Sequence, residues 1–127
     1  MENIIKNDKG FIGKNGFKIS KLTDEECILE YEIKESGLNP MGMVHGGILF
    51  GLADTSAGAL SFYTGRKCVT TSATMNYLNP AKEGKVYARA TALKIGNRIG
   101  YYDVVITDDN GKVIATSMVN MYFNSNK

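Results

Sequence analysis

One segment of the sequence, residues 46–63, is eighteen residues long and carries a single charged side chain, Asp54. It is longer than an ordinary buried strand, and it lacks the β-branched residues that strands favour. Drawn as a helix, it has apolar side chains on every side, which is typical of a helix buried in a core. Its glycines and its central carboxylate argue against a membrane span. We therefore expect a central core helix that ends near Gly65.

The rest of the chain shows the patterns of antiparallel strands. Residues 16–22 and 27–33 alternate apolar and polar side chains, and the polar residues between them indicate a hairpin turn. Four further strands are expected at residues 68–78, 86–95, 100–107 and 112–123, with a hairpin turn at residues 108–111. Five or six antiparallel strands wrapped around one apolar helix make an α+β architecture.

Composition restricts the possible classes of function. The 127 residues suffice for one domain, which we expect to span residues 1–127 with a core at about residues 12–124. Fifteen basic and 13 acidic residues leave a net charge of +2, which does not favour a nucleic-acid binder. Two cysteines and one histidine exclude a standard zinc cluster and a disulfide-dense scaffold. The polar N-terminus does not resemble a signal peptide, so we expect a cytoplasmic protein that contacts neither nucleic acid nor membrane.

Asp54 is the first candidate for chemistry. Burial of an unpaired carboxylate costs several kcal/mol, and helix propensity does not favour aspartate in mid-helix. Thr55, Ser56 and Ser61 supply hydroxyl groups nearby, but no Lys or Arg lies at helical spacing to neutralise the charge. An acid in such surroundings is a candidate nucleophile or general base. The alternative is structural: Asp54 faces an exposed side of the helix or caps a neighbouring backbone segment.

The second candidate is the helix start, His45-Gly46-Gly47. The first N–H groups of a helix have no intrahelical partner and lie at the positive end of the helix dipole. A bare glycine there could donate a hydrogen bond to a carbonyl oxygen that gains negative charge during a reaction. Alternatively, the two glycines only permit close packing of the helix on the sheet, and His45 is an ordinary first-turn residue.

Helix geometry separates these two candidates within one chain. Gly46 and Asp54 are eight residues apart, about 12 Å along a helix. A donor and a carboxylate that act on one carbonyl must both lie about 3 Å from it. One helix can hardly satisfy this, whereas two antiparallel copies can. If the two groups act together, we expect their site at a two-fold interface.

Three stretches of the sequence resemble a known family, with the likeness extending over about residues 35–123. They are Asn39-Pro-Met-Gly-Met-Val-His-Gly-Gly-Ile-Leu-Phe-Gly-Leu-Ala-Asp54, Thr70-Thr-Ser-Ala-Thr-Met-Asn-Tyr-Leu-Asn-Pro-Ala81 and Val113-Ile-Ala-Thr-Ser117. They are similar to hotdog-fold acyl-CoA thioesterases of the phenylacetic-acid-degradation (PaaI) type. The resemblance implies an antiparallel sheet around a long helix, a homodimer often doubled to a homotetramer, and an acyl-CoA or aryl-CoA substrate. It implies no metal, and no cofactor beyond the CoA of the substrate.

The resemblance also implies roles for five residues. Asp54 corresponds to the catalytic carboxylate, which attacks the thioester carbonyl or activates water. Gly46 corresponds to the N–H group that polarises that carbonyl. Asn39 and His45 match positions that line the same pocket from the subunit supplying Gly46. Thr70 matches a Ser or Thr that positions water on the subunit supplying Asp54.

Several details stay open at the level of sequence. A shift of one residue in the strand from Cys68 would exchange Thr70 for Thr71 or Ser72 at the site. Asn79 stands where many relatives carry Arg, which removes one expected phosphate contact. The candidate contacts for the CoA phosphates are Lys82, Arg98 and Lys94. For each of them the more common alternative is an ordinary solvated charge at a strand end.

The leading hypothesis is hydrolysis of acyl- or aryl-CoA thioesters to a free acid and CoA. The alternative is a module of the same fold that binds or senses acyl-CoA without turnover, because a fold does not determine a function. A hydratase or dehydratase is less consistent with these motifs, and a purely structural role would make Asp54 replaceable by Leu. The acyl group depends on which large side chains face the site: Met41, Met43, Phe50, Phe62 or Tyr63.

Overall fold

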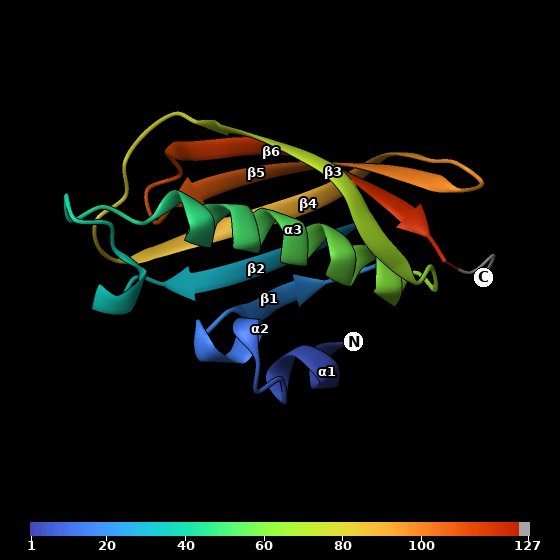
Figure 1. The fold of residues 1–127 in the computed structure, drawn as a ribbon, viewed down its shortest axis with the longest axis horizontal. Helices are drawn as coiled ribbons and strands as arrows, with labels where there is room; N and C mark the ends of the chain where they lie inside the picture. The colour runs from blue at the N-terminus through green and yellow to red at the C-terminus, as the bar shows by residue number, and fades with distance from the viewer. Residues whose placement is uncertain (125–127) are drawn as a thin grey trace.

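The computed structural model describes residues 1–124, and its centre is one long helix, α3 (Gly46–Tyr63), packed on a six-stranded antiparallel sheet (Figure 1). The strands are β1 (Lys18–Leu22), β2 (Glu26–Glu32), β3 (Cys68–Tyr77), β4 (Lys85–Ile95), β5 (Ile99–Asp108) and β6 (Val113–Phe123). Their order is β1-β2-β4-β5-β6-β3, so β1 and β3 form the two edges. This confirms the predicted α+β hotdog architecture, and the predicted elements lie within about two residues of the observed ones.

Helix α3 begins and ends where the sequence indicates. His45 is the N-cap residue, with extended backbone angles. At the other end, Gly65 has a φ of +90°, a conformation that favours glycine, and the Arg66 N–H donates to the Ser61 carbonyl. Between these ends, side chains such as Leu52 and Leu60 are buried against strands β2 to β6. The sheet therefore covers much of the apolar helix, while Phe50, Phe62 and Tyr63 stay partly exposed.

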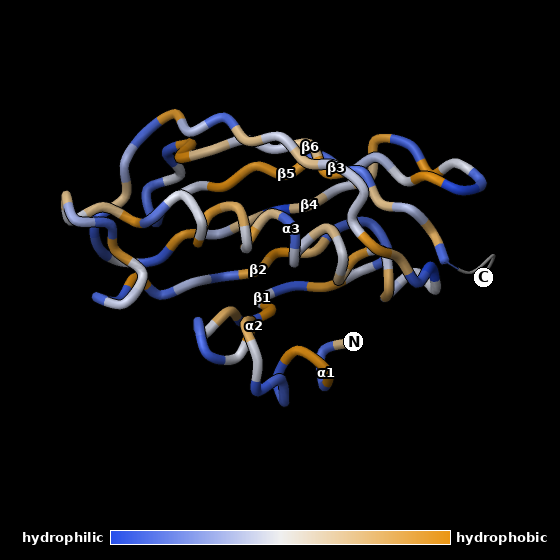
Figure 2. Tube along the Cα trace, in the orientation of Figure 1, coloured by the Kyte–Doolittle hydropathy of each residue, from blue (hydrophilic) through white to orange (hydrophobic). Residues whose placement is uncertain are grey.

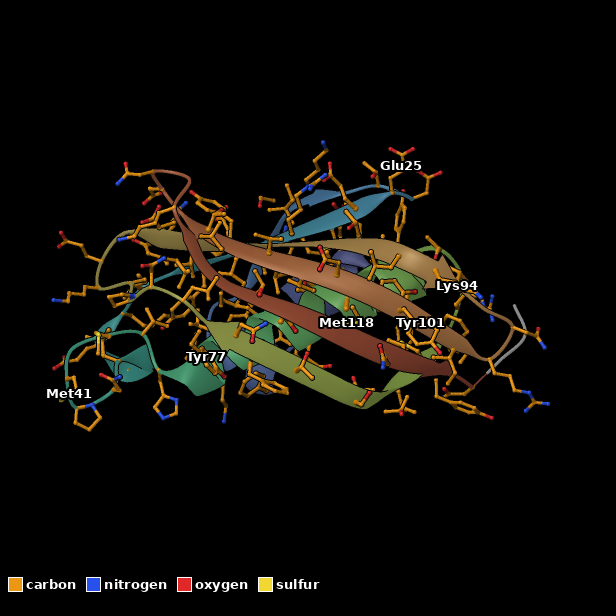
Figure 3. The ribbon with its side chains drawn as sticks, turned by 90° about the horizontal axis from the view of Figure 1, so that it is seen from above. Glu25, Met41, Tyr77, Lys94, Tyr101 and Met118 are labelled. Atoms are coloured by element: carbon orange, nitrogen blue, oxygen red, sulfur yellow. The ribbon has the colours of Figure 1, made fainter. Side chains whose placement is uncertain are left out.

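The sheet supplies the other half of the core, mainly through alternating buried residues on its central strands. On β4 the side chains of Val86, Ala88 and Ala90 are fully buried, as are Val104 and Ile106 on β5. The intervening residues face the opposite side of the sheet, where Figure 3 shows Tyr101 and Met118. Figure 2 shows the corresponding hydrophobic stretches along the central strands, with hydrophilic loops at the ends of the sheet.

A bulge in β3 changes which of its side chains face α3. Thr70 pairs with Met121 of β6, but Ser72 pairs with the next residue, Asn120, so Thr71 is an extra residue. Before the bulge, Cys68 and Thr70 face the helix side. After it, Ala73 and Met75 pack against the core instead, and the Ser72 hydroxyl accepts a hydrogen bond from Asn120 on the outer side.

Two short N-terminal helices, α1 (Glu2–Lys6) and α2 (Phe11–Lys14), were not expected from the sequence. In Figure 1 they lie beyond the β1 edge of the sheet. Helices of five and four residues have little stability of their own, so tertiary contacts must hold them. Ile5 is buried in the core, and the Phe11 ring packs edge-on against Phe17.

A 3₁₀ turn, η1 (Glu35–Gly37), leads from β2 into the loop before α3. No helix within residues 1–124 has both the length and the apolar character required to cross a membrane.

We expect Leu52→Ala to lower the free energy of unfolding by about 2–5 kcal/mol, because Leu52 is fully buried between α3 and the sheet and its truncation leaves a cavity. Urea titration followed by circular dichroism, at one fixed protein concentration, measures the change. The matched control is Met118→Ala on the outer side of the sheet, which should shift stability by no more than about 0.5 kcal/mol. Equal shifts for both variants would contradict this placement of the core.

Candidate active site

Asp54 is half-buried on α3, and its carboxylate faces β3. The Thr70 hydroxyl donates to Asp54 Oδ1 at 2.5 Å and lies 3.4 Å from Met121 Sδ. By contrast, the buried hydroxyls of Ser56 and Ser61 donate to backbone carbonyls. Within the described part of the chain no salt bridge includes Asp54. Asp54 is therefore a carboxylate held by one hydroxyl, with acceptor capacity left over for another molecule.

The bulge in β3 decides which hydroxyl reaches the carboxylate. Of the three candidates, Thr70 is the one bonded to Asp54, whereas Ser72 faces the other side of the sheet. Thr71 is the extra residue at the bulge. The structure thus places the predicted hydroxyl beside the predicted carboxylate.

Asp54 and Thr70 line a cavity of about 220 Å³, which we call the Asp54 cavity. Its other walls are mostly apolar side chains from the α1 end, α2, α3, β3 and β6, together with the side chain of Thr55 on α3. The Cys68 thiol also lines it, but burial raises the pKa of that thiol, and the nearby Asp54 charge raises it further. A protonated thiol is a poor nucleophile, so Asp54 is the better candidate for attack or proton abstraction here.

The N-terminus of α3 leaves one backbone donor unused. The Gly47 N–H donates to His45 Nδ1 at 2.8 Å, and the Ile48 and Leu49 N–H groups donate to the His45 carbonyl. The Gly46 N–H has no partner among the residues that the structure describes. His45 therefore caps the helix, and Gly46 presents the free N–H group at its positive end.

Gly46 lines a second cavity, of about 360 Å³, which we call the Gly46 cavity. Asn39 lines it too, and its side-chain oxygen accepts hydrogen bonds from the Met41 and Met43 N–H groups, which shapes the loop before α3. The predicted pocket residue His45 is exposed and does not line this cavity. The structure therefore brings Asn39 and Gly46 together, with His45 next to them as the cap.

Tyr77 has a role at this cavity that the sequence did not reveal. Its hydroxyl donates to the Gly46 carbonyl at 3.2 Å, and its ring atoms would lie 3.2–3.3 Å from a Cβ atom at Gly46. A side chain at position 46 would therefore press on this ring. Tyr77 belongs to one of the motifs noted above, but its direction depends on the bulge in β3.

The two cavities share no lining residue. Asn39 and Gly46 belong to one, and Asp54 and Thr70 belong to the other, as expected for groups about 12 Å apart along one helix. Of the large side chains considered for the acyl pocket, Met43 lines the Gly46 cavity and Phe62 the Asp54 cavity. The remaining three, Met41, Phe50 and Tyr63, are exposed and line neither.

The three candidate phosphate contacts do not form one cluster within a single chain. Lys82 follows Ala81, which lines the Gly46 cavity, whereas Figure 3 shows Lys94 at the end of the molecule opposite Tyr77. Arg98 lies in the turn after β4, and all three cations are exposed. The Asn79 side chain donates to the Val113 carbonyl at 2.8 Å and so helps to hold its own loop.

Comparison with known sequences agrees with this geometry. The profile of the Thioesterase superfamily matches residues 41–115, which include the helix, Asp54 and Thr70. ComA2 of Bacillus subtilis (strain 168) is 32% identical over 106 residues, which cover 80% of this chain and 84% of ComA2.

Solved structures are similar over most of the chain. A hypothetical thioesterase of Streptococcus pneumoniae TIGR4, solved with coenzyme A, is 26% identical with a TM-score of 0.84, over 88% of this chain and 91% of that one. A mutant of the phenylacetic acid degradation protein PaaI of Thermus thermophilus is 29% identical with a TM-score of 0.84, over 89% and 97% of the two chains. This chain is therefore a member of the thioesterase superfamily with the hotdog fold.

Proposed function

We propose that this protein hydrolyses acyl-CoA thioesters to a free acid and CoA, at a site that two copies of the chain complete together. The observation that carries the proposal is a pair of groups on α3. Among residues 1–124, the Asp54 carboxylate has the Thr70 hydroxyl as its one hydrogen-bond partner, and the Gly46 N–H has none. The coenzyme A in the Streptococcus pneumoniae structure supports a CoA ester as the substrate class.

The chemistry follows from these groups. Asp54 either attacks the thioester carbonyl carbon directly or takes a proton from an attacking water molecule. The Gly46 N–H donates to the carbonyl oxygen as that oxygen becomes negative. The carbon–sulfur bond then breaks, and the CoA thiolate leaves and takes up a proton. On the direct route, water hydrolyses the resulting acyl–aspartyl anhydride and restores the carboxylate.

Thr70 orients the carboxylate in this scheme. Its hydroxyl occupies one lone pair of Oδ1, which restricts rotation of the Asp54 side chain. Oδ2 remains available for the substrate carbon or for water. Thr70 is thus a positioning residue whose loss should reduce the rate less than the loss of Asp54.

The edge of the sheet supports a two-copy site. β3 is an edge strand. It carries two apolar side chains that are about half exposed, Val69 and Tyr77, and a third, Leu78, follows directly after the strand. Exposed apolar edge strands are prone to pair with another strand. Pairing two β3 strands antiparallel places two α3 helices side by side in opposite directions, with Gly46 of one copy near Asp54 of the other. A dimer of such dimers is compatible with this arrangement.

We expect Asp54→Asn to lower kcat by about 10²–10⁴-fold, because an amide can neither attack nor take the proton. Its oxygen can still accept the Thr70 hydrogen bond, so the fold should be kept. Release of free thiol from a panel of acyl- and aryl-CoA thioesters measures the rate. Asp24→Asn, the same chemical change in an exposed turn, is the matched control. Full activity of Asp54→Asn contradicts the mechanism, and binding without turnover in wild type favours the sensing module instead.

Replacing Gly46 tests the backbone donor. Gly46→Pro removes the N–H, and proline is well tolerated at the first position of a helix after a residue with the extended angles of His45, φ −64° and ψ 139°. Gly46→Ala is the matched control, because it brings the same Cβ close to Tyr77 but keeps the N–H. We expect proline to lower kcat by about 10²–10³-fold and alanine to lower it far less. Equal losses in both variants would exclude the donor role.

Mixed oligomers test whether the site is shared. A chain with Asp54→Asn and a chain with Gly46→Pro should each be nearly inactive alone. The two chains are coexpressed with different tags, and the mixed dimer is purified by both tags. One of its two sites then has both groups intact, so about half of the wild-type activity should return, against about a quarter in the unfractionated, randomly paired mixture. Coexpression of two differently tagged Asp54→Asn chains is the control. No recovery in the purified mixed dimer would show that each chain carries a complete site.

A further inference from the structure

The Asp54 cavity extends from the carboxylate into an apolar space that the hydrolysis itself does not explain. Its apolar walls come from four regions: Met1 and Ile5 at α1, Ile12 of α2, Phe62 of α3, and Val69 and Met121 of the sheet. The polar side chains that line it are those of Asp54, Thr55 and Thr70. An apolar space that begins at the reacting carboxylate is suited to the apolar part of a substrate.

The N-terminal helices form this wall because they are fastened to the core. Ile5 is 3% exposed, and the Phe11 ring packs so closely on Gly51 of α3 that a Cβ atom there would lie 2.8 Å from it. Phe11 also packs edge-on against Phe17. These contacts hold α1 and α2 at a defined distance from α3, and that distance sets the width of the cavity.

We propose that the Asp54 cavity holds the acyl group of the thioester and that the helices α1 and α2 set the maximum size of that group. This inference rests on the proposed function, and it divides the substrate between two copies. The CoA part approaches from the Gly46 cavity of one copy, and the acyl part enters the Asp54 cavity of the other. The carbonyl lies between them, next to Asp54 and the partner's free N–H group.

The size of the cavity indicates the substrate class. Its volume is about 220 Å³, somewhat more than the roughly 150 Å³ of an apolar cavity that binds benzene. It therefore has room for an apolar acyl group of about six to nine carbon atoms, straight or cyclic. A long fatty acyl chain would extend beyond the residues that line the cavity. Each additional methylene that fits should raise affinity about fourfold, and methylenes beyond the limit should add little.

Gly58 offers a direct way to change the cavity. It lines the Asp54 cavity from α3, and the nearest atom to a Cβ built on it is Met121 Cε at 3.7 Å, an ordinary contact. The Cβ atom of a leucine at this position meets no backbone atom closely, and the rest of its side chain would occupy space assigned to the acyl group. Ile12 of α2 also lines the cavity and is only partly buried, so Ile12→Ala widens the cavity.

The test uses S-alkyl-CoA thioethers with butyl, octyl and dodecyl chains, which resemble the substrate but cannot be hydrolysed. Calorimetric titration of the wild-type protein should show octyl-CoA binding about 10²-fold more tightly than butyl-CoA, and dodecyl-CoA gaining little more. Gly58→Leu should reduce the octyl preference at least tenfold without weakening butyl-CoA. Ile12→Ala should raise the affinity for dodecyl-CoA relative to that for octyl-CoA. Ile4→Ala, on the exposed side of α1, is the matched control and should change none of these ratios.

The outcomes separate the two proposals. The acyl cavity is overturned if Gly58→Leu leaves the octyl-to-butyl ratio unchanged and Ile12→Ala leaves the dodecyl-to-octyl ratio unchanged, with circular dichroism confirming that both variants fold. If Gly58→Leu does not fold, the Ile12→Ala ratio decides alone. Thiol release from the corresponding acyl-CoA esters judges the hydrolysis independently. If thioether affinities change with chain length and variant as predicted but no ester is hydrolysed, the acyl cavity is supported and the proposed hydrolysis is overturned. If esters are hydrolysed but the affinity ratios stay unchanged in the variants, the hydrolysis is supported and the acyl cavity is overturned. No thioether binding by wild type overturns the acyl cavity.

Discussion

The packing of α3 on the sheet is the interaction on which the rest of the structure depends. The helix is apolar on almost every side, so a single sheet face cannot cover it completely. Strands β2 to β6 bury one side, and the N-terminal helices pack on part of what remains, with Phe11 against Gly51. The surface left over runs beside the edge strand β3 and carries Asp54. Both cavities lie along α3, one near its N-terminus and one along its C-terminal half.

The electrostatics of this surface are sparse, which restricts the chemistry it can perform. Within the part of the chain that the structure describes, Asp54 has one hydroxyl partner and the helix start offers one unused N–H. The neighbouring thiol of Cys68 has a raised pKa because it is buried. A carboxylate and a single donor suffice for attack on an activated carbonyl such as a thioester. They cannot act on the same carbonyl within one chain, because the helix itself holds them apart. The proposed pairing of two copies removes that restriction without any rearrangement of the fold.

Much of this could be predicted from residues alone. The bounds of α3 follow from the apolar segment between His45 and Gly65, and the strands follow from alternation, because both signals are local. Asp54 and the Gly46 N-terminus were also recognisable, since a lone charge in an apolar helix and bare glycines at its start are unusual. The short helices α1 and α2 were missed because segments of five and four residues are too short for helical periodicity to be distinguished from chance.

The sequence by itself determined the helix, the strands, the identity of the carboxylate and its separation from the helix start. Only the tertiary structure decided which hydroxyl reaches Asp54, because the extra residue Thr71 reverses the alternation of β3 and a bulge depends on pairing with β6. The same reversal turns Tyr77 toward Gly46. Tertiary packing also brought Ile5 and Ile12 to the wall of the Asp54 cavity, since nothing in a local pattern relates residues that are more than forty positions apart.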